Sequence, residues 1–103
     1  MDQANRYINF KRVENQRFKI LANPHHDVLL EEVSPLKKIG RGYESFSLLF
    51  SCQRQDVIPQ GNYVFHNDEL GQTQIFLTPI HYPQGKQTKD YYEAIFSYAT
   101  KTQ

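Results

Sequence analysis

The sequence contains few of the features that mark exported, metal-binding or membrane proteins. Its 103 residues include a single cysteine, Cys52, so an internal disulfide and a cysteine-rich metal site are both excluded. Cys52 stands in an apolar run, which predicts a small buried hydrophobe rather than a reactive thiol. The first ten residues, MDQANRYINF, lack the basic and apolar regions of a signal peptide. No apolar stretch approaches the ~18 residues of a membrane helix. We therefore expect a cytoplasmic protein without a membrane partner.

An excess of charge of one sign is also missing. Twelve Lys and Arg residues face eleven Asp and Glu residues, and the formal net charge is +1. Such a balance provides no general attraction for nucleic acid or anionic lipid, so we expect no nucleic-acid partner. The basic segment 37–42, KKIGRG, has the wrong spacing for a phosphate-binding loop, and no helix follows it. This segment is predicted to be a solvated loop.

Aromatic residues, by contrast, are plentiful and alternate along the chain. Seven Tyr and seven Phe make up 14% of the sequence, and such side chains favour strands and interfaces. The segment YESFSLLFSCQ, residues 43–53, has the clearest period of two, with apolar residues on one face and serines on the other. Similar alternation predicts this inward-facing set: Phe46, Leu48, Phe50, Tyr63, Phe65, Tyr92, Ala94 and Phe96.

Strand patterns recur from residue 17 to residue 99 and are separated by short turns. They fall at 17–22, 28–36, 43–53, 62–66, 74–78 and 91–99. The second of these has an ambiguous period, because Leu29 and Val33 share a face whereas Val28 and Leu30 point the other way. Asn67 to Gly71 is typical of a hairpin turn in which Gly71 takes the left-handed position and Asn67 and Asp68 bond to the backbone.

These patterns predict one all-β domain over residues 1–103. Segment 1–15 is expected to form a short helical turn that plugs an open end or covers an edge. Residues 16–99 are expected to form about six antiparallel strands in a meander, which closes, or nearly closes, into a small barrel. A two-layer sandwich is the alternative. Residues 100–103 are expected to be a frayed tail.

Several motifs together resemble an uncharacterised family of small bacterial all-β domains. The segments that support this resemblance are SFSLLF at 45–50, PQGNYVFH at 59–66, Leu70-Gly71, IFLTP at 75–79 and YEAIF at 92–96. The resemblance covers about the last 55 residues well and extends weakly to RFKIL and EEVSPL. It implies a setting beside phage-tail-collar-like proteins, and so an accessory role for a tail-like fibre. It implies no catalytic residues.

Reactive groups do not form a recognisable constellation in the sequence. His25-His26-Asp27 resembles a metal-binding cluster, but the side chains of neighbours on an extended chain point apart. Nothing in the spacing requires His66 and His81 to lie close together. No carboxylate pair or nucleophile–base pair is encoded locally. We expect no metal, no cofactor and no enzymatic activity. The alternative is a small-ligand-binding barrel or a minor enzyme with a pocket at the barrel mouth lined by Tyr63, His66 and Tyr92.

The most informative feature is an apolar surplus on the faces that point outward. If the inward set fills the interior, the outward candidates are Leu49, Val64, Phe76 and Ile95. Either the segment containing Tyr7, Ile8 and Phe10 covers them, or they form a contact surface for a protein partner or a second copy. We therefore predict a non-enzymatic protein-interaction or assembly module. Pairing along an unpaired strand edge is a third possibility.

Overall fold

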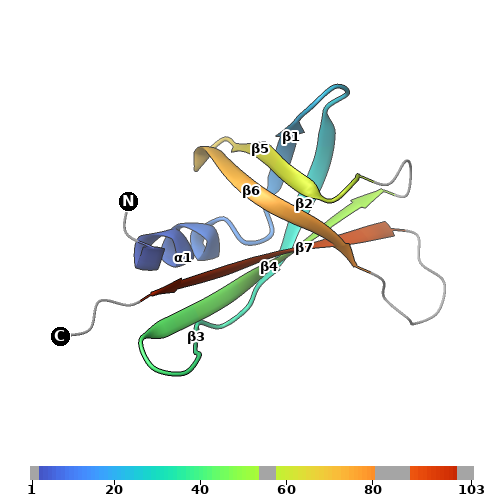
Figure 1. Ribbon diagram of the computed structural model, residues 1–103. Helices are drawn as coiled ribbons and strands as arrows, with labels where there is room; N and C mark the ends of the chain where they lie inside the picture. Colours follow the sequence, from blue (N-terminus) through green and yellow to red (C-terminus); the bar gives the residue numbers. More distant parts are fainter. Residues whose placement is uncertain (1–2, 54–57, 81–88, 100–103) are drawn as a thin grey trace.

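The computed structural model describes residues 3–53, 58–80 and 89–99, with side chains from Arg6 onward. It contains one helix and seven strands (Figure 1). These elements are α1 (Gln3–Arg12), β1 (Arg17–Leu21), β2 (His26–Val33), β3 (Lys37–Lys38), β4 (Tyr43–Gln53), β5 (Gly61–Asn67), β6 (Gly71–Ile80) and β7 (Lys89–Ala99). The predicted tail at 100–103 and His81 lie outside the described residues.

Six antiparallel strands form a closed barrel, and the short β3 is an additional strand beside β4. The pairing order is β2-β1-β5-β6-β7-β4, and β2 also pairs with β4, which closes the ring. Closure protects most strand edges, although β6 and β7 pair only from Thr78↔Glu93 to Ile80↔Tyr91. The predicted antiparallel barrel with a short N-terminal helix is therefore confirmed.

The order of the strands differs from a simple meander. β1, β2 and β4 follow one another around the barrel, as do β5, β6 and β7. These two groups join through β4 with β7 and through β1 with β5, rather than through the sequential neighbours β4 and β5. The β4–β7 pair is the longest, running from Tyr43↔Ala99 to Gln53↔Lys89. Because every one of these pairs is antiparallel, hairpin counting in the sequence could not distinguish the two orders.

The interior is filled by side chains, as the alternation predicted. Of the eight residues expected inside, six are fully buried, and Tyr63 and Phe96 are partly buried against them. The rings of Phe46 and Phe96 are stacked with centroids 5.0 Å apart, and Phe18, Phe50 and Phe65 form a second aromatic group. Burying each large side chain contributes roughly 1.5–3 kcal/mol, so this core is the main source of stability.

A β-bulge resolves the ambiguous period of β2. The β2–β4 register shifts between Leu30 and Glu32, so Val28, Leu30 and Val33 are all buried. One extra residue in a strand moves all later side chains to the opposite face. The strand also begins earlier and ends earlier than the predicted 28–36.

The helix plugs the wedge between two diverging parts of the barrel, and it is shorter than the predicted segment. In Figure 1, α1 lies between the β5–β6 side and the long strands β4 and β7. Phe10 and Val13 are buried in the core. The chain then turns at Asn15, whose φ of 72° is left-handed, and this conformation is common after a helix end.

Two other local predictions are corrected. The segment 37–42 is not wholly a loop, because Lys37–Lys38 pairs with Ser45 and Glu44 of β4. Pro79 does not end its strand, since β6 continues to Ile80 and Pro79 lies opposite Tyr92. The pairing of β5 with β6 stops at Gly61↔Leu77, so Pro79 has a strand neighbour on one side only, where a missing amide is tolerated.

Candidate functional site

Three of the four predicted contact residues are strongly exposed on the outside of the barrel. The exposed fractions are 37% for Val64, 48% for Phe76 and 65% for Ile95. Each points outward because its strand neighbours on both sides, such as Ile75 and Leu77, point into the core. The fourth, Leu49, is half-buried and lies opposite Glu93 of β7 and Glu32 of β2.

The strand registers place two of the three exposed side chains side by side. Val64 pairs with Gln74, so Phe76 is its diagonal neighbour. The pairing of β6 with β7 ends at Thr78↔Glu93, so Ile95 is exposed on the outer face of β7 where the two strands diverge (Figure 1). We call Val64, Phe76 and Ile95 the outer apolar patch.

The helix does not cover this patch. Tyr7 packs edge-on against Phe46, with ring centroids 5.3 Å apart, and Phe10 contacts Phe46 and Phe96. These partners belong to the inner faces of β4 and β7. Ile8, the third apolar residue of the predicted cover, is itself 52% exposed. Within the described residues the outer apolar patch therefore faces solvent.

The alternative ligand-pocket residues do not surround one mouth. The backbone amide of Ile58 donates a hydrogen bond of 3.0 Å to the Tyr92 hydroxyl, and the Tyr63 hydroxyl donates one of 2.6 Å to the carbonyl of Pro59. Burial raises the pKa of the Tyr92 phenol. His66 lies on the outer face of β5, where its Nε2 is 3.5 Å from Asp68. The sheet therefore separates His66 from the buried Tyr92.

The hairpin between β5 and β6 is held by a buried asparagine. Asn67 Oδ1 accepts hydrogen bonds from the amides of Glu69 and Leu70, at 2.9 and 2.8 Å. Its Nδ2 donates to the Arg17 carbonyl at 3.0 Å and to Gln16 at 3.2 Å. Gly71 has φ 85°, as predicted for the left-handed position. Asn67 thus has a structural role, and its link to β1 had no signal in the sequence.

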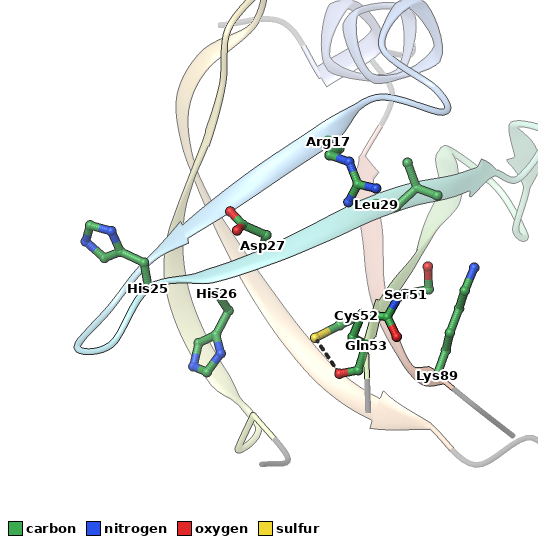
Figure 2. A pocket seen from close by; sticks show the side chains of 9 residues that line it. All are labelled: Arg17, His25, His26, Asp27, Leu29, Ser51, Cys52, Gln53 and Lys89. Carbon is green, nitrogen blue, oxygen red and sulfur yellow. Dashed lines mark hydrogen bonds between the residues drawn. The ribbon is translucent and has the colours of Figure 1, made fainter. Parts of the chain in front are cut away.

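The histidine pair lies at the tip of the β1–β2 hairpin. Asp27 forms an ion pair of 3.4 Å with Lys19 on the neighbouring strand. In Figure 2, His25 and His26 extend from opposite sides of the chain. No group of three or more His, Cys, Asp or Glu residues suited to a metal ion occurs in the described part of the chain.

A pocket of about 360 Å³ opens where β2 and β4 separate. The pairing of these strands ends at Leu29↔Ser51, although β2 begins at His26 and β4 continues to Gln53. Figure 2 shows side chains reaching this space from the β1–β2 hairpin on one side and from β4 and β7 on the other. The lining includes Arg17, Asp27, Leu29, Ser51, Cys52 and Lys89. No sequence signal indicated this pocket, because it depends on where two distant strands stop pairing.

Glu31 links two sides of this pocket's rim. Ser51 is buried, and its hydroxyl donates a hydrogen bond of 2.5 Å to the Glu31 carboxylate. Lys89 Nζ lies 3.5 Å from the same carboxylate. Cys52 is half-buried and packs against the core, in accord with the predicted small hydrophobe, and burial together with Asp90 and Asp27 raises its pKa.

Comparison with known proteins provides a family but no described function. In the described part of the chain, no helix has the length and apolarity needed to cross a membrane. No curated protein and no solved structure gives a significant match. Residues 6–96, which span most of the helix and nearly all of the barrel, match a family described only as a domain of unknown function. The chain therefore belongs to the DUF6916 family.

Proposed function

We propose that this protein is a non-enzymatic interaction or assembly module that binds a protein partner through the outer apolar patch. The observation that carries the proposal is the exposure of Val64 and Phe76 as diagonal neighbours on paired strands, together with the exposure of Ile95 on the outer face of β7. Exposed aromatic and branched side chains that gather together are typical of contact sites, whereas single ones are not.

The surroundings of the patch support a contact with an uncharged partner. Most outward-facing positions around it carry small or amide side chains, and the nearest ionisable groups among the described residues are Glu93 and His66. The centres of protein interfaces are depleted in charge, because desolvating a charge is unfavourable. The uncharged neighbours are Ser47, Asn62, Gln74, Thr78 and Ser97.

The contact that these three side chains offer is small. A standard interface needs ~800 Å² from each partner, more than three partly exposed side chains supply, so a one-to-one contact built on them alone would be weak with a second copy or with a different protein. Weak contacts suffice where many copies bind one assembly, because effective concentration then compensates for low affinity.

This reasoning supports the setting that the sequence resemblance implied. A tail-like fibre presents repeated copies of the same surface, which suits a small module with one modest contact patch. We therefore propose a phage-tail-like fibre or its assembly intermediate as the partner. The filled core, with Tyr92 bonded to Ile58, is consistent with a role that needs no internal substrate cavity.

The proposal is tested with Phe76→Asp and Ile95→Asp in a binding assay against a phage-tail-collar-domain protein. Each variant is expected to weaken binding at least about tenfold, since a charge would replace an apolar side chain at the contact centre. Ile39→Asp is the matched control, because Ile39 is 49% exposed but lies beyond β3. Wild-type affinity in both patch variants would refute the proposal.

Sedimentation of the isolated protein distinguishes the two kinds of partner. We expect a monomer at micromolar concentration. A dimer that Ile95→Asp dissociates would assign the patch to self-association and overturn the proposed fibre partner.

A further inference from the structure

We propose that the pocket between β2 and β4 is a binding site for a small oxyanion, a carboxylate or a phosphate group. This site is separate from the outer apolar patch. It rests on the size of the pocket, on the guanidinium of Arg17 in its lining and on two strand segments that border it without a strand partner among the described residues.

The volume fits a small molecule. A pocket of about 360 Å³ lies within the range of ~300–1,000 Å³ that is typical of ligand sites. The site can therefore hold an anionic group with a compact body, for which Leu29 and Cys52 provide apolar wall.

The charges around the pocket leave Arg17 without a counterion. Lys19 neutralises Asp27 at 3.4 Å, and Lys89 shares the Glu31 carboxylate with Ser51. In the described residues no carboxylate lies within ion-pair distance of Arg17. Asp90, opposite Cys52 on β7, adds a third carboxylate, so the charges near the pocket balance. Arg17 is nevertheless a lining cation that no described carboxylate pairs, and its planar guanidinium matches carboxylate and phosphate oxygens.

The backbone around the pocket adds donors of the appropriate kind. β2 from His26 to Val28 and β4 from Cys52 to Gln53 extend beyond their last mutual pair, Leu29↔Ser51. Each of these segments is paired on its other side, with β1 or β7, and its second edge has no strand partner among the described residues. Backbone amides at such an edge can donate to an oxyanion, as they do in other anion-binding concavities.

The arrangement also explains why Arg17 is well suited to binding rather than to stability. Its side chain is exposed at the start of β1, and it is the Arg17 carbonyl, not the guanidinium, that accepts the bond from buried Asn67. Replacing the side chain leaves that backbone bond intact. Arg17→Gln is therefore a suitable test variant, because the barrel is expected to fold unchanged.

The test is a two-dimensional ¹H–¹⁵N NMR titration of the whole chain. Inorganic phosphate and succinate are added separately, and sodium chloride at matched ionic strength is the reference. We expect saturable chemical-shift changes of the amides of residues 26–29 and 51–53 with phosphate, succinate or both. The anion that causes these changes at the lower concentration is the preferred oxyanion. Arg17→Gln should weaken that binding at least about tenfold. Lys37→Gln, on exposed β3 outside the pocket, should bind as the wild type does.

Two results would overturn the inference. One is a response to phosphate and succinate no larger than the response to chloride. The other is unchanged affinity in Arg17→Gln while the spectrum shows an intact fold. Neither result bears on the outer apolar patch, so this proposal and the protein-contact proposal fail independently.

Discussion

The phenolic oxygen of Tyr92 lies 3.0 Å from the backbone nitrogen of Ile58, whose amide donates a hydrogen bond to it. Tyr92 stands on β7, and Ile58 precedes β5. Their bond holds Ile58, which is 1% exposed, in the core near the inner end of Tyr92. A buried amide without a partner is unfavourable, so this contact helps decide where the chain enters β5.

Tyr92→Phe is expected to lower the free energy of unfolding by about 1–3 kcal/mol. The substitution keeps the ring but leaves the Ile58 amide buried without an acceptor. Urea unfolding measures the loss. Tyr43→Phe is the control, because Tyr43 is 55% exposed and its change should stay within about 0.5 kcal/mol. Equal stability of Tyr92→Phe and wild type would show that this bond contributes nothing.

Glu14 stabilises the bulge in β2 and does so in a pH-dependent way. Its carboxylate accepts a hydrogen bond of 2.8 Å from the Val33 amide and pairs with Lys11 at 3.1 Å. The bond from Val33, followed by that from Lys11, lowers the pKa of Glu14. The carboxylate therefore contributes stability above the unfolded pKa of about 4.3, and this stability is lost as the pH falls through the lower folded pKa.

Glu14→Ala should lower the free energy of unfolding at pH 7 by about 1–2 kcal/mol, since it removes the acceptor for the Val33 amide. Glu14→Gln retains an oxygen acceptor and should lose less. Unfolding curves at several pH values between neutral and acidic conditions check both variants. The difference between wild type and Glu14→Gln should shrink below about pH 4.3; a difference that stays constant would contradict this role.

Asn67→Ala should be among the most destabilising substitutions, by about 2–4 kcal/mol, because it leaves two turn amides and the Arg17 carbonyl without their partner. Asn67→Asp retains the acceptor for the turn amides but loses the donor. Thermal unfolding of both variants apportions the loss between the hairpin and its link to β1. An Asn67→Ala variant with the melting temperature of the wild type would show that these hydrogen bonds do not stabilise the fold.

Cys52 should react slowly with thiol reagents in the folded protein. Burial raises its pKa, with a smaller effect from Asp90 and Asp27, so less thiolate is present at neutral pH. We expect the reaction with an aromatic disulfide reagent to be at least about tenfold slower than in the unfolded chain. Equal rates in buffer and in guanidinium chloride would show a freely accessible thiolate.

Much of the barrel could be predicted because local patterns and global burial agree. In β4 the apolar residues Phe46, Leu48 and Phe50 recur every second position, and that period alone assigns them to one face. The hairpin from Asn67 to Gly71 could also be predicted, since few residue types other than glycine adopt the left-handed backbone conformation that Gly71 has.

The candidate sites were less accessible to the same reasoning. The run Ile75-Phe76-Leu77 must leave an apolar side chain outside in either register, and the structure shows that Phe76 is the exposed one because Ile75 and Leu77 are buried. Nothing local indicated that Ser51 would be buried beneath Glu31, or that Arg17 would border a pocket with Lys89. Those relationships join strands that are far apart in the chain.

The sequence by itself determined the fold class and the inward-facing side of most strands, because a period of two couples each residue to its face wherever the strand lies. Only the tertiary structure decided which strands are neighbours, where β2 carries its bulge and where β2 and β4 stop pairing. Those features depend on the competition between many antiparallel pairings for one core, and the pairings that win are the ones that bury Val28, Leu30 and Val33 together.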